Sequence, residues 1–184
     1  MVANEKDQVV VPEEALAAAA SCEPVSDEDQ RLLEKYSRTF IGSFSHSLDA
    51  KGRLVVPQVF RENLGDTFCI APSYDFKSIA LYPNLMWARM RDRYDKLGKM
   101  NSSLKRYLEQ LDALSFRGQE CDNQGRVLLP AKIRSCILED EKDVDITGAN
   151  DHVRVVAHIS ADEQFKQFME DLPGILDDIN SLEV

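Results

Sequence analysis

Several features that mark membrane proteins and metal proteins are missing from this sequence of 184 residues. No apolar run approaches the roughly 20 residues that a membrane-spanning helix needs. The cysteines form no Cys-x-x-Cys pair, and the three histidines show no metal-ligand spacing. We therefore expect no membrane segment, no metal ion and no cofactor. We also expect the four cysteines to be reduced thiols in the cytoplasm, namely Cys22, Cys69, Cys121 and Cys136.

The sequence also lacks the short motifs of common enzyme classes. There is no Gly-x-Ser-x-Gly, no glycine-rich phosphate loop and no His-Glu-x-x-His. An alanine-rich stretch before Cys22 is similar to a secretory signal, but no basic region precedes it, and Pro12 and Glu13 interrupt it. We expect a protein that is not an enzyme and that has no small-molecule substrate.

Positive charge is scarce overall, because the chain has 22 Lys and Arg against 32 Asp and Glu, which gives a net charge of −10. The excess acidity lies at the two ends. Residues 1–38 carry four basic and nine acidic side chains, and residues 158–184 carry one basic and seven acidic ones. Residues 39–157 are nearly balanced, with 17 basic and 16 acidic side chains. Such a central region can bind phosphate groups if its cations gather on one face.

What the sequence does contain is an internal repeat with an offset of 73 residues. Residues 49–57 read Asp-Ala-Lys-Gly-Arg-Leu-Val-Val-Pro, and residues 122–130 read Asp-Asn-Gln-Gly-Arg-Val-Leu-Leu-Pro. A second arginine follows four residues after each proline, as Arg61 and Arg134. Residues 68–70 also resemble 144–146, and residues 79–82 resemble 153–156. Each copy predicts the order strand, glycine turn, strand, short helix, strand, strand.

The residue types of the motif favour a tight turn between two strands. Asp49 and Asp122 can accept hydrogen bonds from backbone amides two residues later, and glycine tolerates the positive φ of a turn at Gly52 and Gly125. The aliphatic triplet suits a buried strand, and the proline ends that strand and can begin a helix. One such copy is too small to bury a core well, so we expect the two to pack together.

The arginine of each turn, Arg53 or Arg126, has two interpretations. As a DNA ligand it would place its guanidinium on guanine edges or phosphates, and as a structural residue it would pair with the aspartate of its own turn. Lys51 can contact phosphate, whereas its counterpart Gln124 brings no charge. For Arg61 and Arg134 we expect a solvated helix face or an interface salt bridge.

Helical patterns occupy the rest of the chain. Apolar residues at three- and four-residue steps predict two helices within residues 86–114, with a serine or asparagine capping the second. Interleaved aspartates there favour a solvated face for a run of cations, which comprises Arg89, Arg91, Arg93, Lys96, Lys99, Lys105 and Arg106. A further helix begins near Ser160 and should end at Pro173, before a loose acidic tail. We expect residues 1–38 to be an acidic extension, partly disordered, with a helix at 29–36.

Residues 40–54, Phe-Ile-Gly-Ser-Phe-Ser-His-Ser-Leu-Asp-Ala-Lys-Gly-Arg-Leu, closely resemble the opening of MraZ proteins. Residues 57–64, Leu81-Tyr82-Pro83 with Trp87, and residues 122–130 fit the same family in order and spacing, so the resemblance covers about residues 39–172. It implies an α+β fold with two tandem AbrB/SpoVT-like swapped-hairpin β modules, at 39–85 and 115–159, in a pseudo-twofold unit. A helical linker at 86–114 and a C-terminal helix with an acidic tail at 160–184 complete the chain.

The resemblance also implies a function. Members of the family assemble into rings, bind short direct repeats in the promoter of the division and cell-wall gene cluster, and associate with the nucleoid. It therefore implies double-stranded DNA and further copies of the chain as partners, and it assigns DNA binding to Arg53, Arg126 and Lys51. Two hypotheses remain. The arginine in both motifs favours a ring-forming transcription regulator, and the acidic ends favour a protein-interaction or scaffold module of the AbrB fold with lost or weak DNA binding.

Overall fold

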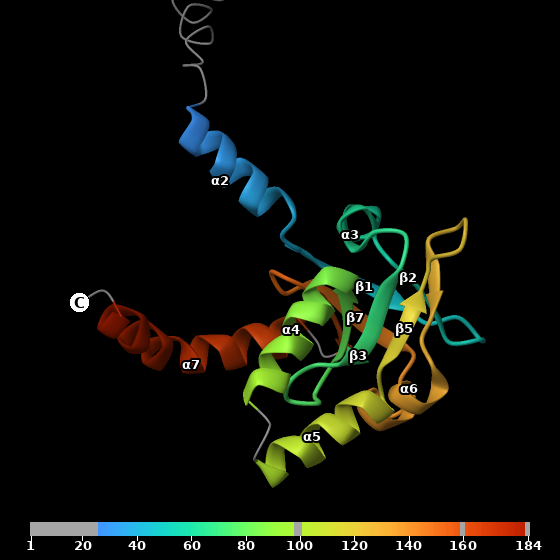
Figure 1. Cartoon of the computed structure of the whole chain (residues 1–184). Helices are drawn as coiled ribbons and strands as arrows, with labels where there is room; N and C mark the ends of the chain where they lie inside the picture. Colours follow the sequence, from blue (N-terminus) through green and yellow to red (C-terminus); the bar gives the residue numbers. More distant parts are fainter. Residues whose placement is uncertain (1–25, 98–100, 159–160, 183–184) are drawn as a thin grey trace, which may run out of the picture. The chain divides into compact units, whose positions relative to one another are not determined.

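The computed structural model in Figure 1 describes residues 26–97, 101–158 and 161–182. The chain divides into two units, Met1–Ser37 and Arg38–Val184. In the first unit, helix α2 (Asp27–Ser37) begins with three acidic residues, and the hydroxyl of Ser26 accepts a hydrogen bond of 3.2 Å from the amide of Asp29. This helix starts two residues earlier than predicted. The alanine-rich stretch before Cys22 lies outside the described residues.

The second unit contains the repeat twice, with the elements in the predicted order. The first copy comprises β1 (Ser43–Ser47), β2 (Arg53–Val55), α3 (Gln58–Leu64), β3 (Phe68–Pro72) and β4 (Ile79–Pro83). The second copy comprises β5 (Phe116–Gln119), β6 (Arg126–Leu128), α6 (Ala131–Ile137), β7 (Asp143–Gly148) and β8 (Val153–Ala157). Helices α4 (Asn84–Leu97) and α5 (Ser102–Ala113) join the copies, and α7 (Ala161–Leu182) follows the second. The fold is therefore α+β, as expected.

The strands form an antiparallel six-stranded sheet of order β1-β7-β8-β4-β3-β5 and a separate pair of β2 with β6. Interchanging the two copies of the repeat reproduces the same order read from the other edge, so the sheet has pseudo-twofold symmetry. Strand β1 of the first copy pairs with β7 of the second, and β5 of the second pairs with β3 of the first. Each copy thus supplies an edge strand to the other.

The main hydrophobic core joins one face of this sheet to α3, α6 and the β2–β6 pair. Matched residues of the two copies take part in it, each at most 1% exposed: Leu54, Val56 and Phe60, with Val127, Leu129 and Ile133. Burying both sets in one cluster supplies the apolar area that a single copy of this length lacks. The expectation that the two copies pack together is confirmed.

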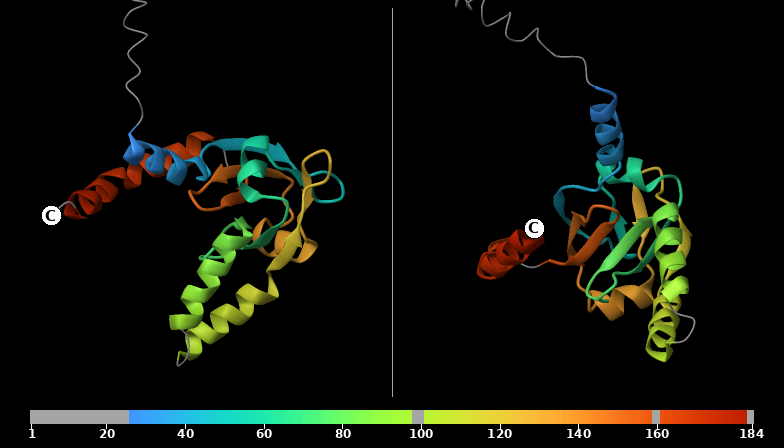
Figure 2. Two further views of the ribbon diagram at one scale, coloured as in Figure 1. Left: turned by 45° about the horizontal axis from the view of Figure 1, so that its top comes forward. Right: turned by 60° about the vertical axis from the view of Figure 1, so that its left-hand side comes forward.

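The opposite face of β3 and β4 is covered by α4 and α5, which form a hairpin of helices (Figure 2). Cys69 lies opposite Tyr82 in the strand pairing. Together with Ala71 and Ala80 of the same strands, these residues pack with Trp87 of α4 and with Leu111 of α5. Asn101 caps α5 by accepting hydrogen bonds from two backbone amides of its first turn, at 2.9 and 3.2 Å, as predicted.

The C-terminal helix differs from its prediction, which ended it at Pro173. Helix α7 continues through this proline to Leu182. A proline inside a helix removes one backbone hydrogen bond, but the helical spacing of apolar residues resumes beyond it with Ile175, Ile179 and Leu182. Residues 173–182, predicted as the end of the helix and the start of a loose tail, are therefore helical.

Candidate nucleic-acid interface

The side chain of Asp49 closes the turn between β1 and β2. Its Oδ1 atom accepts hydrogen bonds from the amides of Lys51 and Arg53, both at 2.9 Å. Its Oδ2 atom accepts a further bond of 2.6 Å from Nε of Arg53. Gly52 donates its amide to the carbonyl of Asp49 at 2.8 Å and has a φ of +77°, a conformation that glycine adopts without strain. The motif therefore fixes both the backbone and the arginine of the turn.

The turn between β5 and β6 repeats this geometry. Oδ1 of Asp122 accepts hydrogen bonds of 2.9 Å from the amides of Gln124 and Arg126. Oδ2 of Asp122 accepts a bond of 2.8 Å from Nε of Arg126, and Gly125 has a φ of +74°. Equal sequence has produced equal local structure, because the hydrogen bonds that define each turn are made within five consecutive residues.

The pairing of β2 with β6 brings the two turns onto one surface. The strands are antiparallel, with Leu54 opposite Val127. On either side of the pair, an amide that follows one strand donates to the carbonyl of the other copy's turn glycine, at 2.9 and 3.1 Å. Nη1 of Arg53 lies 3.9 Å from Oδ2 of Asp122, so the carboxylate of the second turn also approaches the guanidinium of the first. The sequence predicted each turn separately, and the strand pairing places them together.

The second arginine of each copy lies against the other copy's turn. A Cβ atom at Gly52 would come within 2.5 Å of Cζ of Arg134, and one at Gly125 within 2.7 Å of Cζ of Arg61. Nε of Arg134 also donates a hydrogen bond of 3.0 Å to the carbonyl of Leu129.

The structure therefore corrects the expectation of a solvated helix face for Arg61 and Arg134, and an interface salt bridge with another copy stays a prediction. Both are partly buried, and neither has an ion pair within the described part of the chain. Sequence reasoning missed the contact because it joins residues from different copies. The one available signal was that arginine and glycine recur at the same offset.

The turn arginines are neutralised in part by their own aspartates. Nη2 of Arg53 lies 2.6 Å from Asp49, and Nη2 of Arg126 lies 2.7 Å from Asp122. The side chains of the two arginines remain 29% and 27% exposed. The hydrogen bonds from Arg126 lower the pKa of Asp122 to about 2, and the backbone amide of Arg53 is the main cause of a lowered pKa at Asp49. Both interpretations of the arginines are compatible, since the aspartate orients a guanidinium that still reaches solvent.

The two turns differ in the charges around them. The second turn adjoins a hollow of about 450 Å³ that is lined in part by Glu62 and Glu120. The matching positions near the first turn hold Ser135 and Ser47. The first turn also carries Lys51, which is exposed, where the second carries an uncharged glutamine. Ser47 in turn donates a hydrogen bond to the carboxylate of Asp143, so the feature that distinguishes the loop of the first turn is its additional cation.

No cluster of metal-ligating side chains occurs among the described residues. Within the same residues, no helix combines the length and apolarity that crossing a bilayer requires. Of the three cysteines described, Cys69 is buried, Cys121 is partly buried and Cys136 is exposed. Burial raises the pKa of the Cys69 thiol to about 11, as suits a core residue rather than a reactive one.

Comparison with known proteins agrees with the motif. Residues 39–111 match the family model described as "MraZ protein, putative antitoxin-like". The chain is 30% identical over 147 residues to the transcriptional regulator MraZ of Desulforamulus reducens, covering 74% of this chain and 99% of that protein. It is 34% identical over 140 residues to the protein of the same name from Lactiplantibacillus plantarum, covering 76% and 94%. The chain therefore belongs to the MraZ family.

Proposed function

We propose that this protein is a transcription regulator that binds double-stranded DNA in a sequence-specific manner through its two glycine turns. The observation that carries the proposal is the pairing of β2 with β6, which presents Arg53 and Arg126 on one surface. The related proteins are named transcriptional regulators, which supports the proposal. The targets are short direct repeats in the promoter of the division and cell-wall gene cluster, and the protein acts in the cytoplasm in association with the nucleoid.

The chemistry of binding follows from the guanidinium group. Asp49 and Asp122 engage the Nε and Nη2 edge of Arg53 and Arg126, which holds each guanidinium in place while its side chain stays partly exposed. A guanidinium held in this way can form paired hydrogen bonds to guanine or phosphate oxygens at a small cost in side-chain entropy. Lys51 adds a point charge for a phosphate, and Gly52 and Gly125 allow the backbone to turn tightly beside the duplex.

We infer that the two copies are tandem AbrB/SpoVT-like swapped-hairpin modules, at 39–85 and 115–159, and the exchange of strands between the copies supports this. In this arrangement one chain presents a pair of turns related by pseudo-twofold symmetry. Several chains in a ring would engage several direct repeats at once, and such multivalency raises avidity by about 10²–10⁴ over a single contact.

A second candidate function is a protein-interaction or scaffold module with lost or weak DNA binding. The ion pairs between the turn arginines and their aspartates favour it, because they reduce the positive charge that faces a duplex. The net charge of −10 favours it also.

An electrophoretic mobility shift titration against the DNA upstream of the protein's own gene separates the two candidates. We expect specific binding that weakens steeply as salt rises, since bound phosphates release counterions. Arg53→Ala should weaken binding while circular dichroism stays unchanged, and Arg154→Ala, an exposed arginine on β8 away from the turns, should not. Equal affinity for upstream and unrelated DNA would reject the regulator in favour of the interaction module. An Arg53→Ala variant that binds as the wild type does would reject the assignment of DNA binding to this arginine.

A further inference from the structure

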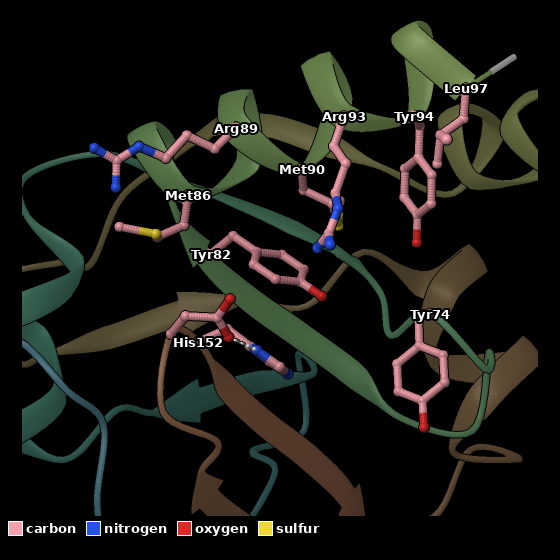
Figure 3. Close-up of a pocket in the computed structure, with 10 residues that line it drawn as sticks. Tyr74, Tyr82, Met86, Arg89, Met90, Arg93, Tyr94, Leu97 and His152 are labelled. Atoms are coloured by element: carbon pink, nitrogen blue, oxygen red, sulfur yellow. Dashed lines mark hydrogen bonds and ion pairs between the residues drawn. The ribbon is translucent and has the colours of Figure 1, made fainter. Parts of the chain in front are cut away.

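A groove of about 740 Å³ lies between α4 and the turn that joins β7 to β8. Its apolar side is a stripe on α4, formed by Met86, Met90, Tyr94 and Leu97 at steps of three and four residues. Figure 3 shows Met90 and Tyr94 projecting from the helix into the hollow above the ring of Tyr82. Leu97, at the end of the stripe, is 68% exposed. The shape and spacing suit an amphipathic helix as the occupant.

The groove also carries two cations without a carboxylate partner among the described residues. Arg89 and Arg93 line it, and Arg93 points into the hollow in Figure 3. The other cations of α4 are paired, since Arg91 lies 3.2 Å from Asp112 and Lys96 lies 2.5 Å from Asp92. The groove's own carboxylate, Asp151, is hydrogen-bonded to His152. Charge complementarity therefore calls for an acidic occupant.

Helix α7 has the complementary character. Its apolar stripe repeats at steps of four, three and four residues, through Phe168, Leu172, Ile175 and Ile179. Three of these four side chains are between 39% and 49% exposed, an unusual exposure for a stripe of large apolar residues. Asp171 and Asp178 flank the stripe at helical spacing, and no ion pair involves them within the described residues. The stripe of α4 from Met86 to Leu97 is about 17 Å long, which accommodates about three turns of α7.

No described residue of α7 belongs to either hydrophobic core, and the pseudo-symmetry of the fold explains why. Helix α7 follows β8 as α4 follows β4, and α4 packs on Cys69, Ala71, Ala80 and Tyr82. The strand registers match these positions to Asp145, Thr147, Arg154 and Val156. The carboxylate of Asp145 is hydrogen-bonded to Ser45 at 2.7 Å and to His158 at 3.0 Å. A helix with an apolar face gains little by packing on a polar surface of this kind.

We propose that α7 of one copy of this chain docks in the α4 groove of a second copy. The contact joins two different surfaces, so it repeats head to tail and closes a ring when the rotation between copies allows. This inference rests on the proposed function, in which the protein acts as a ring, and it names the contact between subunits. The partner is a second copy because β8 carries the chain away from His152, so that α7 begins beyond the far end of the strand.

Charge-reversal variants test the contact. Arg89→Glu with Arg93→Glu replaces two cations of the groove by carboxylates. Asp171→Lys with Asp178→Lys replaces two carboxylates beside the α7 stripe by cations. Glu170→Lys with Asp177→Lys makes the same charge change on the opposite face of α7 and serves as the matched control. Multi-angle light scattering measures the mass of each, and circular dichroism verifies that each is folded.

We expect the wild type and the control to assemble and both reversed variants to be monomeric. An equal mixture of the two reversed variants should assemble again, because acidic α7 then meets a basic groove and basic α7 meets an acidic one. A monomeric wild type, a reversed variant that assembles normally, or a mixture that stays monomeric would overturn the proposal. A mixture that stays monomeric is also the result expected if α7 docked in the groove of its own chain, because mixing would then not bring opposite charges together.

Binding to DNA that carries one repeat separates this proposal from the proposed function. The reversed residues lie outside both glycine turns, so the monomeric variants should bind a single repeat as the wild type does. A protein that assembles as described but binds no DNA would leave this contact standing and would reject the regulator.

Discussion

At the scale of the residue, each glycine turn depends on side chains from both copies of the repeat. The aspartate and the glycine shape the turn from within, and an arginine from the other copy fills the space beside the glycine. The turn arginine is thereby held in place by its own aspartate, and the turn is supported by a second guanidinium beside its glycine.

The unequal charge around the two turns predicts unequal contributions to DNA binding. We expect Arg53→Ala to weaken specific binding by about 1–3 kcal/mol and Arg126→Ala to weaken it less, because Glu62 and Glu120 already lower the potential near the second turn. Mobility shift titrations at one salt concentration measure both. A larger loss for Arg126→Ala would contradict the assignment of the first turn as the principal contact.

The contact between glycine and arginine predicts a specific cost of adding a methyl group. Gly118→Ala is the control, since Gly118 has a φ of +66° with open space around it, and it should cost about 1–2 kcal/mol of stability from backbone strain alone. Gly52→Ala should cost about 1 kcal/mol more, because it also displaces Arg134 from its hydrogen bond to Leu129. Urea denaturation provides the measurement.

A second substitution checks the cause of that extra cost. Combining Gly52→Ala with Arg134→Ala removes the guanidinium that the new methyl group meets, so the two losses should be less than additive. Additive losses would show that strain at residue 52, and not the arginine, sets the cost.

The lowered pKa of Asp122 predicts a response to acid. The folded carboxyl titrates at about 2 instead of 3.8, so the unfolded chain binds this proton at higher pH than the folded chain does. Its contribution to stability is present above about pH 4 and is lost as the pH falls toward about 2. Carboxyl NMR titration should find this low midpoint and should find it raised in Arg126→Ala. A midpoint near 3.8 in the wild type would contradict the ion pair.

At the scale of the element, the helices that join the two copies form a core of their own. Helices α4 and α5 cover the outer face of β3 and β4, and the ring of Trp87 lies 5.8 Å from that of Tyr82. The matching face of the second copy carries Asp145 and Arg154 in place of Cys69 and Ala80, so it offers an apolar helix a more polar surface. Two copies of one motif thus differ in what their outer faces can bind.

Because the core beneath α4 is small, we expect the stability of the fold to depend strongly on one aromatic residue, Trp87. Trp87 is 6% exposed, and Trp87→Ala should destabilise the fold by about 3–5 kcal/mol through lost burial and an unfilled cavity. Leu85→Ala removes a residue of the same helix that is 55% exposed and should cost less than about 0.5 kcal/mol. Guanidinium denaturation compares the two variants, and similar losses would mean that α4 does not depend on this contact.

At the scale of the whole molecule, the exchange of edge strands makes the two copies one folding unit. Strand β1 completes the sheet of the second copy and β5 that of the first, and the main core contains matched residues of both. Loss of either copy would expose the apolar core residues of the other, so partial unfolding should be strongly disfavoured.

Coincident unfolding transitions should follow from this arrangement. Trp87 is the only tryptophan in the sequence, and its fluorescence reports on the first copy, whereas far-ultraviolet circular dichroism reports on the helices and strands of both. We expect both signals to give the same denaturation midpoint. Separate midpoints would mean that the copies fold independently despite their shared sheet.

Much of the fold and of the candidate site could be predicted from the sequence. The order of elements in each copy, the helical linker and the asparagine cap at residue 101 all depend on residues near one another in the chain. The place of Arg61 and Arg134 could not be predicted, since their partners lie in the other copy. The end of α7 was predicted wrongly, because Pro173 was given more weight than the apolar spacing beyond it.

The sequence by itself determined the two turns, because each aspartate finds its hydrogen-bond donors within four residues. Only the tertiary structure decided that the turns share one surface and that a guanidinium lies beside each glycine. Those properties arise from the pairing of β2 with β6, whose central residues lie 73 positions apart, and no local preference of the chain specifies which distant strand will be the partner.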